Sequence, residues 1–289
     1  MFRVKPVQIL KRWTREVIAR FPGNHRQEVP EASPARPATV LRQLDFMRMF
    51  LRSFFIQSLW NYRCLQSVGF CIALFPIARR LYKTPEERRG FLLRHLKFFN
   101  AHPYMASYAL GVCARLEEAH ACGDPQALKK LDRVKELLIS ILGAVGDHLF
   151  WFVIKPFSLI MGVLLITLVD SELYKALALG ATFLMYNIPH FYLRYKGLKE
   201  GYRYGLEIYR CFTGERFQGL ERIYLYGGIV AFLLFLAILI RTMITVGLLN
   251  ILVWSLAAVS AFIVYRFTQS LYMAVFLSLL IGLVAGIFH

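Results

Sequence analysis

Polar side chains interrupt the apolar segments of this chain at a few places, and they are the residues whose types could bind a ligand. Most stand beside a proline or a glycine within an apolar run. The candidate binding residues are Asn100, His102, Asp147, His148 and Asn187, with Gln57 and Asn61 as a further, weaker group. Amide, imidazole and carboxylate groups supply paired hydrogen-bond donors and acceptors. We therefore expect polar sites where apolar helices are interrupted.

Asp147 is open to two interpretations. It lies near the middle of residues 137–169, an almost wholly apolar run that is longer than the about 20 residues a straight membrane helix needs. The helix could enter the membrane, break at Gly146–Asp147 and resume, as the broken helices of many transporters do. Alternatively, Asp147 caps a second helix at a membrane surface, because Asp is a favourable N-cap. A carboxylate at bilayer depth costs roughly 2.5–3.5 kcal/mol, so it should face protein, water or a ligand.

The sequence gives little support for a metal site or for a catalytic residue. The histidines at 95, 102, 148 and 190 lack ligand spacing, and the five cysteines form no CxxC pair. A membrane enzyme acting on lipid phosphates would need clustered carboxylates to hold its metal ions, and the five aspartates lie far apart in the sequence. The sequence predicts no catalytic residue, no metal site and no cofactor.

The C-terminal part of the chain settles its class. Between residues 223 and 289 the only charged side chains are Arg241 and Arg266, and they divide it into three apolar runs at 223–240, 242–265 and 267–288. Each run is close to the length that spans a membrane. We therefore predict an all-α, polytopic integral membrane protein with broken or re-entrant helices.

The net charge of +17 has two explanations, nucleic-acid binding or basic cytoplasmic loops. Lys and Arg are spread between apolar runs, which favours the loops and predicts no nucleic-acid partner. Residues 4–21 form a basic amphipathic pattern that suits an anionic membrane surface or docking on the rest of the protein. A proline-rich linker follows, to about residue 39. We expect residues 1–45 to be a basic, cytoplasmic N-terminal extension and residues 46–289 to be the membrane domain.

Local signals place several helix ends and packing faces. Residues 46–82 are amphipathic and predict a re-entrant or interfacial hairpin. Thr84, Pro85 and Glu87 predict a helix start with a capping box. Small residues at 106–114 and glycines at 197, 201 and 205 form two stripes suited to close helix packing. Because they have no obvious mates in so short a chain, they predict a partner subunit.

Several motifs, in order, resemble the IID subunits of mannose-family sugar phosphotransferase systems (PTS). The segment FFNAHPYMASYALGVCARLEE resembles the family's Phe-Phe-Asn-Thr-His-Pro segment, and GAVGDHLFW resembles its Gly-Ile-Gly-Asp-Ser-Leu-Phe-Trp segment. The stretch YNIPHFYLRYKGLKEGYRYG resembles the Trp-Asn-Ile-Pro segment and glycine helix, and LSLLIGLVAGIFH the C-terminal end. The segments RSFFIQSLWNY and VGFCIALFPIARRLY resemble the N-terminal block. The resemblance covers residues 46–289.

The resemblance implies a multi-pass subunit of the cell inner membrane that carries a hexose together with a IIC subunit, in a trimer of IIC–IID pairs. Phosphate would come from the soluble IIA and IIB proteins, so the chain would not itself be an enzyme. The candidate binding residues would then line the sugar path or hold the helix ends beside it. Three departures leave a transport-inactive regulatory or scaffold subunit as the alternative. They are Ser140–Ile141 in place of Gly-Pro, His148 in place of Ser, and the N-terminal extension.

Overall fold

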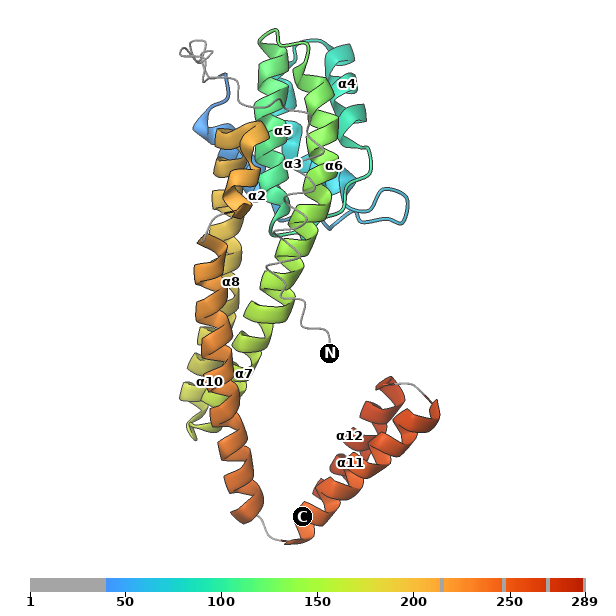
Figure 1. The fold of residues 1–289 in the computed structure, drawn as a ribbon, viewed down its shortest axis with the longest axis vertical. Helices are drawn as coiled ribbons and strands as arrows, with labels where there is room; N and C mark the ends of the chain where they lie inside the picture. The colour runs from blue at the N-terminus through green and yellow to red at the C-terminus, as the bar shows by residue number, and fades with distance from the viewer. Residues whose placement is uncertain (1–39, 214–215, 246–247, 269–270, 288–289) are drawn as a thin grey trace. The chain divides into compact units, whose positions relative to one another are not determined.

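The structure is a computed structural model that describes residues 40–213, 216–245, 248–268 and 271–287 (Figure 1). The chain divides into two compact units, residues 1–228 and residues 229–289. The basic helix predicted at 4–21 and its linker lie outside the described residues. The predicted cytoplasmic location of the N-terminus therefore stays a prediction. The domain boundary expected after residue 45 falls inside the first described helix.

Helices make up most of the described chain, which confirms the all-α prediction. In order they are α2 (Gln43–Ser53), α3 (Ser67–Leu81), α4 (Pro85–His95), α5 (Ala106–Ala121), α6 (Ala127–Gly146), the π-helix η1 (Asp147–Ile154), α7 (Lys155–Thr167), α8 (Glu172–Tyr204), the short 3-10 helix η2 (Gly205–Glu207), α9 (Tyr209–Thr213), α10 (Arg216–Thr245), α11 (Leu248–Thr268) and α12 (Leu271–Ile287). Within these residues the only β pairing is two isolated bridges, at Asn61–Leu65 and Leu65–Phe99.

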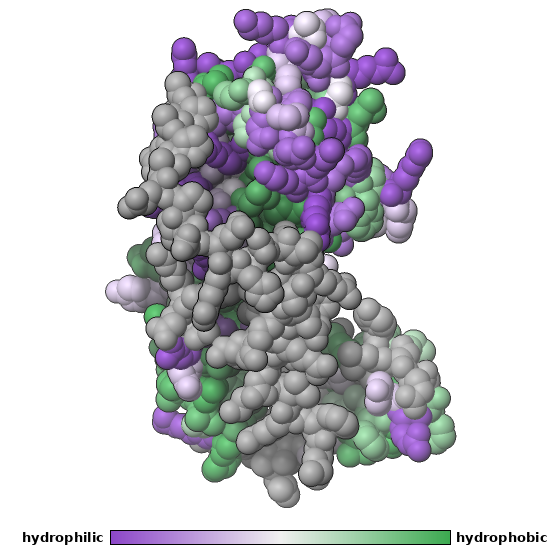
Figure 2. Space-filling view, turned by 45° about the horizontal axis from the view of Figure 1, so that its top comes forward, coloured by the Kyte–Doolittle hydropathy of each residue, from purple (hydrophilic) through white to green (hydrophobic). Residues whose placement is uncertain are grey.

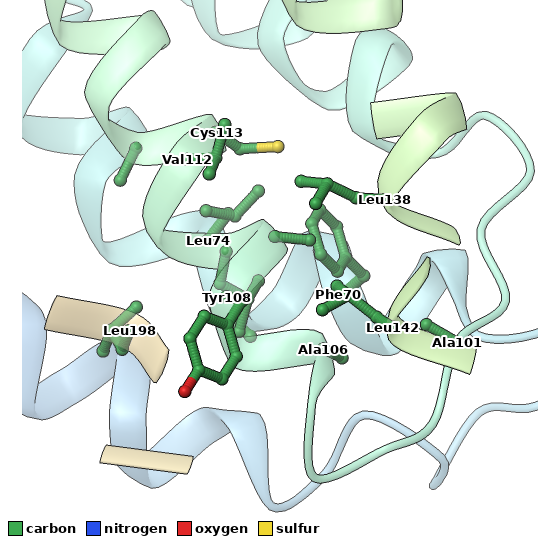
Figure 3. Close-up of a cluster of buried hydrophobic side chains, with 14 of the residues drawn as sticks. Phe70, Leu74, Ala101, Ala106, Tyr108, Val112, Cys113, Leu138, Leu142 and Leu198 are labelled. Carbon is green, nitrogen blue, oxygen red and sulfur yellow. The ribbon is translucent and has the colours of Figure 1, made fainter. Parts of the chain in front are cut away.

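Helix α5 is the centre of the first unit. All of its residues from Ala106 to Ala114 are buried, a pattern typical of a helix surrounded by protein. Helices α3, α6 and α8 pack against it. Figure 3 shows Phe70 of α3 and Leu138 of α6 meeting beside α5, with Tyr108 pointing away from them. Neighbouring helices therefore enclose α5 and hold it in place.

Small residues bring α5 and α8 into backbone contact. A Cβ added at Gly111 would overlap the backbone of Leu198, and one at Gly201 would overlap the carbonyl of Tyr108. A Cβ added at Gly197 would likewise overlap the Tyr108 ring. The two small-residue stripes therefore pack against each other. The expectation that they lack mates within the chain is wrong, and they give no reason to invoke a partner.

Helix ends follow the local sequence signals. Thr84 and Glu87 form the predicted capping box at the start of α4. No helix spans the residues directly before Pro103, because α4 ends at His95 and α5 begins three residues after the proline. Gly205 has a φ of +51°, which glycine adopts readily, and it ends α8 instead of extending the glycine stripe.

Helix α8 runs through Pro189 without a break, so the interruption predicted at Asn187 is wrong. Proline lacks the N–H that would bond the carbonyl of Met185, four residues earlier. The hydroxyl of Tyr224 in α10 donates a hydrogen bond of 3.0 Å to that carbonyl. A neighbouring helix thus supplies the donor that the proline removes.

The surface of the first unit changes character along its length. Hydrophilic residues crowd the end that holds α4 and the turn between α5 and α6 (Figure 2). Farther along the chain, α7 and α8 expose large apolar side chains such as Leu159, Leu177 and Phe183. Two continuous helices, Ala127–Thr167 and Gly219–Thr242, are long and apolar enough to cross a membrane. An apolar exposed surface is what contact with lipid requires.

The second unit contains the end of α10 together with α11 and α12. Helices α11 and α12 pack against each other. The three apolar runs predicted from the sequence correspond to these three helices. Helix α10 continues through Arg241 to Thr245, so this arginine does not mark its end. The described apolar side chains of α11 and α12 are largely exposed, as Phe262 and Leu279 illustrate.

Candidate functional site

The apolar stretch predicted to break at Gly146–Asp147 changes its helix type there. The π-helical segment η1 joins α6 to α7 with no gap in the helix. Asp147 has φ and ψ of −61° and −45°, whereas an N-cap residue has non-helical dihedrals. The cap interpretation is therefore wrong, and the expected break takes the form of a wider helical turn. Such π-helical turns are rare and frequently occur at functional sites.

His102, in the segment before α5, packs directly on this change of helix type. Its side chain is 3% exposed, and a Cβ added at Gly146 would overlap it. The His102 ring stacks on Phe150 of η1, with ring centroids 5.0 Å apart and an angle of 10° between the planes. The structure thus places one predicted polar residue, His102, against Gly146, the residue that precedes the predicted Asp147.

A row of rings continues from His102 across to α8. Tyr104 packs edge-on against Phe150 and stacks on His190 at 3.7 Å. The hydroxyl groups of Tyr104 and Tyr186 lie 3.2 Å apart, within hydrogen-bond distance. We call His102, Tyr104, Phe150, Tyr186, His190 and Arg194 the His102–Arg194 cluster. It joins the segment before α5, the π-helical segment and α8 at one point.

Arg194 closes this cluster as a buried cation, 3% exposed. Its Nε donates to Nε2 of His190 at 3.1 Å, and its Nη1 donates to the carbonyl and the hydroxyl of Ser53 at the end of α2. The guanidinium also lies over the rings of Phe54 and Tyr104, at 4.6 and 5.5 Å. Within the described residues it has no ion pair, which is unusual for a buried charge.

His102 is neutral at physiological pH in this setting. Burial, with a contribution from the nearby Arg194 cation, lowers the pKa of His102 to about 4. Its Nδ1 accepts a hydrogen bond from the Tyr104 N–H at 3.4 Å. The ring therefore acts as a fixed, uncharged wedge between the segment before α5 and η1.

Asn100 and Asp147 have exposed side chains near this buried ring. Asp147 has no hydrogen bond or ion pair within the described part of the chain. It follows Gly146, on which His102 packs, while Asn100 precedes His102 by two residues. These two predicted residues, close in the chain to the contact between His102 and Gly146, therefore have exposed side chains without a partner within the described residues.

The side chains of the other candidate residues are mostly engaged by different partners. His148 bonds Glu221 of α10 through Nε2 at 3.0 Å, which ties η1 to α10. The amide of Asn187 donates to a carbonyl of its own helix at 2.8 Å. Asn61 accepts two backbone N–H bonds within its turn, and the exposed Gln57 lies in the same turn region. None of these hydrogen bonds involves His102, although His148 follows Asp147 in η1 and Asn187 follows Tyr186 of the cluster.

A second buried polar cluster lies among α3, α4 and α5, around a carboxylate that sequence reasoning missed. Glu117 is fully buried and accepts hydrogen bonds from Tyr82 and, at 2.9 Å, from Arg94. Its other oxygen lies 2.9 Å from Nε2 of His95. Burial alone would raise the pKa of Glu117, but these hydrogen bonds outweigh it and lower the pKa to about 2. We call these four residues the Glu117 cluster.

One cavity of about 290 Å³ opens between α8, α9 and α10. Tyr192, Phe217 and Tyr224 contribute aromatic walls, and Lys196 and Glu200 contribute its charged groups. It contains none of the predicted binding residues. Within the described residues, no group of three His, Cys, Asp or Glu side chains is arranged to hold a metal ion.

Sequence reasoning also missed Arg194 and Tyr104. A usable signal for Arg194 existed, because His190 and Arg194 stand four residues apart and so share one face of a helix. Their partners could not be inferred, since Ser53 is 141 residues away in the chain.

Comparison with known proteins identifies relatives of this arrangement. A family model described as "PTS system mannose/fructose/sorbose family IID component" matches residues 40–255. The "PTS system mannose-specific EIID component" of Escherichia coli (strain K12) is 35% identical over 181 residues, covering 62% of this chain and 62% of the relative. The "Fructose permease IID component" of Bacillus subtilis (strain 168) is 32% identical over 187 residues, covering 62% and 64%. The matched region is less than two thirds of the length of these relatives.

Solved structures give the same picture. A chain from "CryoEM Structure of Mannose Transporter ManYZ and Microcin E492 (MceA) complex" is similar, with 32% identity and a TM-score of 0.53 over 66% of this chain and 69% of that one. A chain from "Structure of membrane protein" matches with 33% identity and a TM-score of 0.56 over the same shares. The sequence and fold comparisons therefore agree.

Proposed function

The chain belongs to the IID components of the mannose/fructose/sorbose family of phosphotransferase systems, and from this membership we propose that it carries a hexose across the inner membrane together with a IIC subunit. The observation that supports this most is the extent of the family match. Residues 40–255 include the whole His102–Arg194 cluster, the π-helical segment and both helices long enough to span a membrane. The likeness to a chain of the mannose transporter ManYZ supports a permease built from more than one membrane subunit.

We propose that the sugar path runs past Asn100 and Asp147, with His102 holding the two chain segments in place. Sugars bind through networks of hydrogen bonds to amide and carboxylate groups, often beside aromatic rings. Both exposed polar residues adjoin the ring-lined cluster. Asn61 and Asn187 use their side chains in local structure, and His148 is engaged by Glu221, so these three contribute less.

The phosphoryl chemistry is proposed to lie on the IIA and IIB proteins and not on this chain. Three of its histidines support that division, because a phosphoryl donor would have to reach an exposed ring. His95, His102 and His190 are 0%, 3% and 8% exposed. The chain thus acts as a translocating subunit, in a trimer of IIC–IID pairs with its N-terminus in the cytoplasm and several membrane crossings.

Sugar uptake in cells tests the proposal. The chain should be expressed with its IIC, IIA and IIB partners in E. coli cells that lack their own mannose-specific EIID component. Uptake of labelled mannose, fructose or sorbose should appear only when both this chain and IIC are present. The mass of the purified complex should correspond to three pairs. A complex that assembles but carries none of these sugars would favour the regulatory or scaffold role.

A further inference from the structure

Helix α2 and the turn after it expose an unusual amount of apolar surface. Eight large apolar side chains are exposed within nineteen residues: Leu44, Met47, Leu51, Phe54, Phe55, Leu59, Trp60 and Tyr62. Tyr62 is 92% exposed, and its ring packs edge-on against Trp60 with centroids 4.8 Å apart. We call these eight residues the α2–turn surface.

The orientation of α2 is fixed by what it buries. Asp45, Met49 and Ser53 are buried at intervals of four residues, while Leu44 and Leu51 are exposed. Asp45 pairs with Arg80, and Ser53 binds Arg194. These anchors turn the apolar row outward, so its exposure follows from the fold.

This helix is too short to cross a bilayer. Its 11 residues span about 16 Å, whereas the hydrocarbon core is about 30 Å thick. The turn after it leads into α3, which passes through Pro76 without a break. Arg52 donates to the Ile72 carbonyl that this proline leaves without its usual donor, at 3.5 Å. The apolar row therefore lies along the outside of a folded helix pair.

The exposed charged side chains between residues 40 and 66 are all positive. Arg42, Arg48 and Arg63 are exposed and form no ion pair within the described residues. Asp45 is the only acidic residue between positions 40 and 66, and it is 1% exposed and held by Arg80. A surface that combines apolar side chains with unbalanced arginines is complementary to anionic headgroups over acyl chains.

We propose that the α2–turn surface docks in the plane of an anionic lipid leaflet. The leucines, Met47 and the phenylalanines sit at the boundary between headgroups and acyl chains, and the arginines meet the lipid phosphates. Trp60 and Tyr62 occupy the headgroup level, where such rings are enriched. Because Ser53 at the end of α2 holds Arg194, the docked helix also fixes the His102–Arg194 cluster relative to the membrane surface.

Fluorescence quenching at Trp60 tests this docking. The full chain would be reconstituted in vesicles of phosphatidylglycerol and phosphatidylcholine in which a fraction of the lipid carries bromine near the headgroup. The signal of Trp60 is the difference between wild type and Trp60→Phe, which cancels the other tryptophans. We expect strong quenching of that signal, and weaker quenching in vesicles of phosphatidylcholine alone.

Charge variants separate lipid docking from burial under a protein. Arg48→Gln and Arg63→Gln should each lower the ratio of docked to undocked surface about fivefold. Arg89→Gln, which alters an exposed arginine of α4 outside this surface, should leave it unchanged. Absence of Trp60 quenching in phosphatidylglycerol vesicles would overturn the proposal, as would equal quenching in the two lipids together with no effect of the arginines. Loss of quenching when the IIC subunit is added would instead assign the surface to that protein.

Discussion

The Glu117 cluster and the His102–Arg194 cluster both bury charge between helices of the first unit, but they balance it differently. In the first, a carboxylate meets Arg94 and His95 at 2.9 Å. In the second, Arg194 has hydrogen bonds and ring faces but no carboxylate within the described residues. Among the described residues, each cluster leaves one buried ring nitrogen, Nδ1 of His95 or of His190, without a partner, so the difference lies in the charge.

This difference in charge balance suggests different roles for the two clusters. The Glu117 cluster links the ends of α3 and α4 to α5, and its buried carboxylate is paired with Arg94. The His102–Arg194 cluster lies beside the π-helical segment and the exposed Asp147, where α2, α5 and α8 also meet. An unpaired buried cation is costly and contributes little to stability. We interpret the first cluster as a support of the fold and the second as the element that positions the ligand site.

Removing Glu117 should have the largest effect. Glu117→Ala leaves the half-buried Arg94 without its counter-ion and the buried Tyr82 and His95 side chains without their partner, which should lower the free energy of unfolding by about 3–5 kcal/mol. Thermal unfolding in detergent measures the loss. The matched control is Asp132→Asn, which breaks the exposed Lys97–Asp132 pair and should cost no more than about 1 kcal/mol. Similar losses in the two variants would remove the distinction between the Glu117 cluster and a surface ion pair.

Lowering the pH should act on the second cluster before it acts on the Glu117 carboxylate. The folded pKa of His102 is about 4 and its ordinary value is 6.5, so its neutral form stabilises the fold fully above pH 6.5. As the pH falls from 6.5 towards 4, the unfolded chain binds a proton at this residue that the folded chain does not bind. This lowers the free energy of unfolding by up to about 3 kcal/mol. The Glu117 carboxylate contributes above pH 4.5, and that contribution is lost as the pH falls through 2. The unfolding temperature should decrease less between pH 7 and pH 5 in His102→Asn than in the wild type. An equal decrease in both proteins would contradict this account.

Two glycines of α6 offer a sharper probe of the His102 contact. A methyl group at Gly146 would overlap His102, whereas nothing lies within 4 Å of a Cβ at Gly143. Gly146→Ala should destabilise the protein by about 1–3 kcal/mol through overpacking. Gly143→Ala should be neutral or stabilising by up to about 1 kcal/mol, because alanine favours helix. Equal unfolding temperatures for the two variants would mean that His102 does not pack against Gly146.

The smallest change in stability is expected from replacing Arg194, and the matched comparison is the replacement of Arg94. Arg94→Met strands a buried carboxylate, but Arg194→Met removes a cation that has no counter-ion. We expect Arg194→Met to change the free energy of unfolding by about 1 kcal/mol and to impair sugar uptake instead. Calorimetry and uptake on the two variants compare them directly. A larger stability loss for Arg194→Met than for Arg94→Met would reverse the assignment of the two clusters.

Local chemistry made part of this structure predictable. The capping box at Thr84 and Glu87 and the helix-free residues before Pro103 depend on neighbouring residues alone, so the sequence predicts them. The fate of Pro189 depends on a donor from another helix, Tyr224, and no local signal reveals it. A proline without such a neighbour would have ended the helix, as the sequence suggested.

The site was predictable as a set of residues but not as an arrangement. Asp147 and His102 drew attention because polar groups are costly within apolar runs. The π-helical turn and the contact between His102 and Gly146 depend on packing between segments more than forty residues apart. The pairing of the two small-residue stripes was missed for the same reason, since the spacing of small residues marks a packing face but does not identify its partner.

Sugar uptake by Asp147→Asn tests the central claim most directly, because the change keeps the shape of the side chain and removes its charge. Asp147 is exposed and has no partner within the described residues, so the variant should fold, unfold at the wild-type temperature and co-purify with its IIC subunit. With assembly intact, we predict that uptake falls at least about tenfold, the equivalent of losing one charged hydrogen bond to the sugar. Normal uptake by an assembled Asp147→Asn complex would contradict the account and place the sugar path elsewhere.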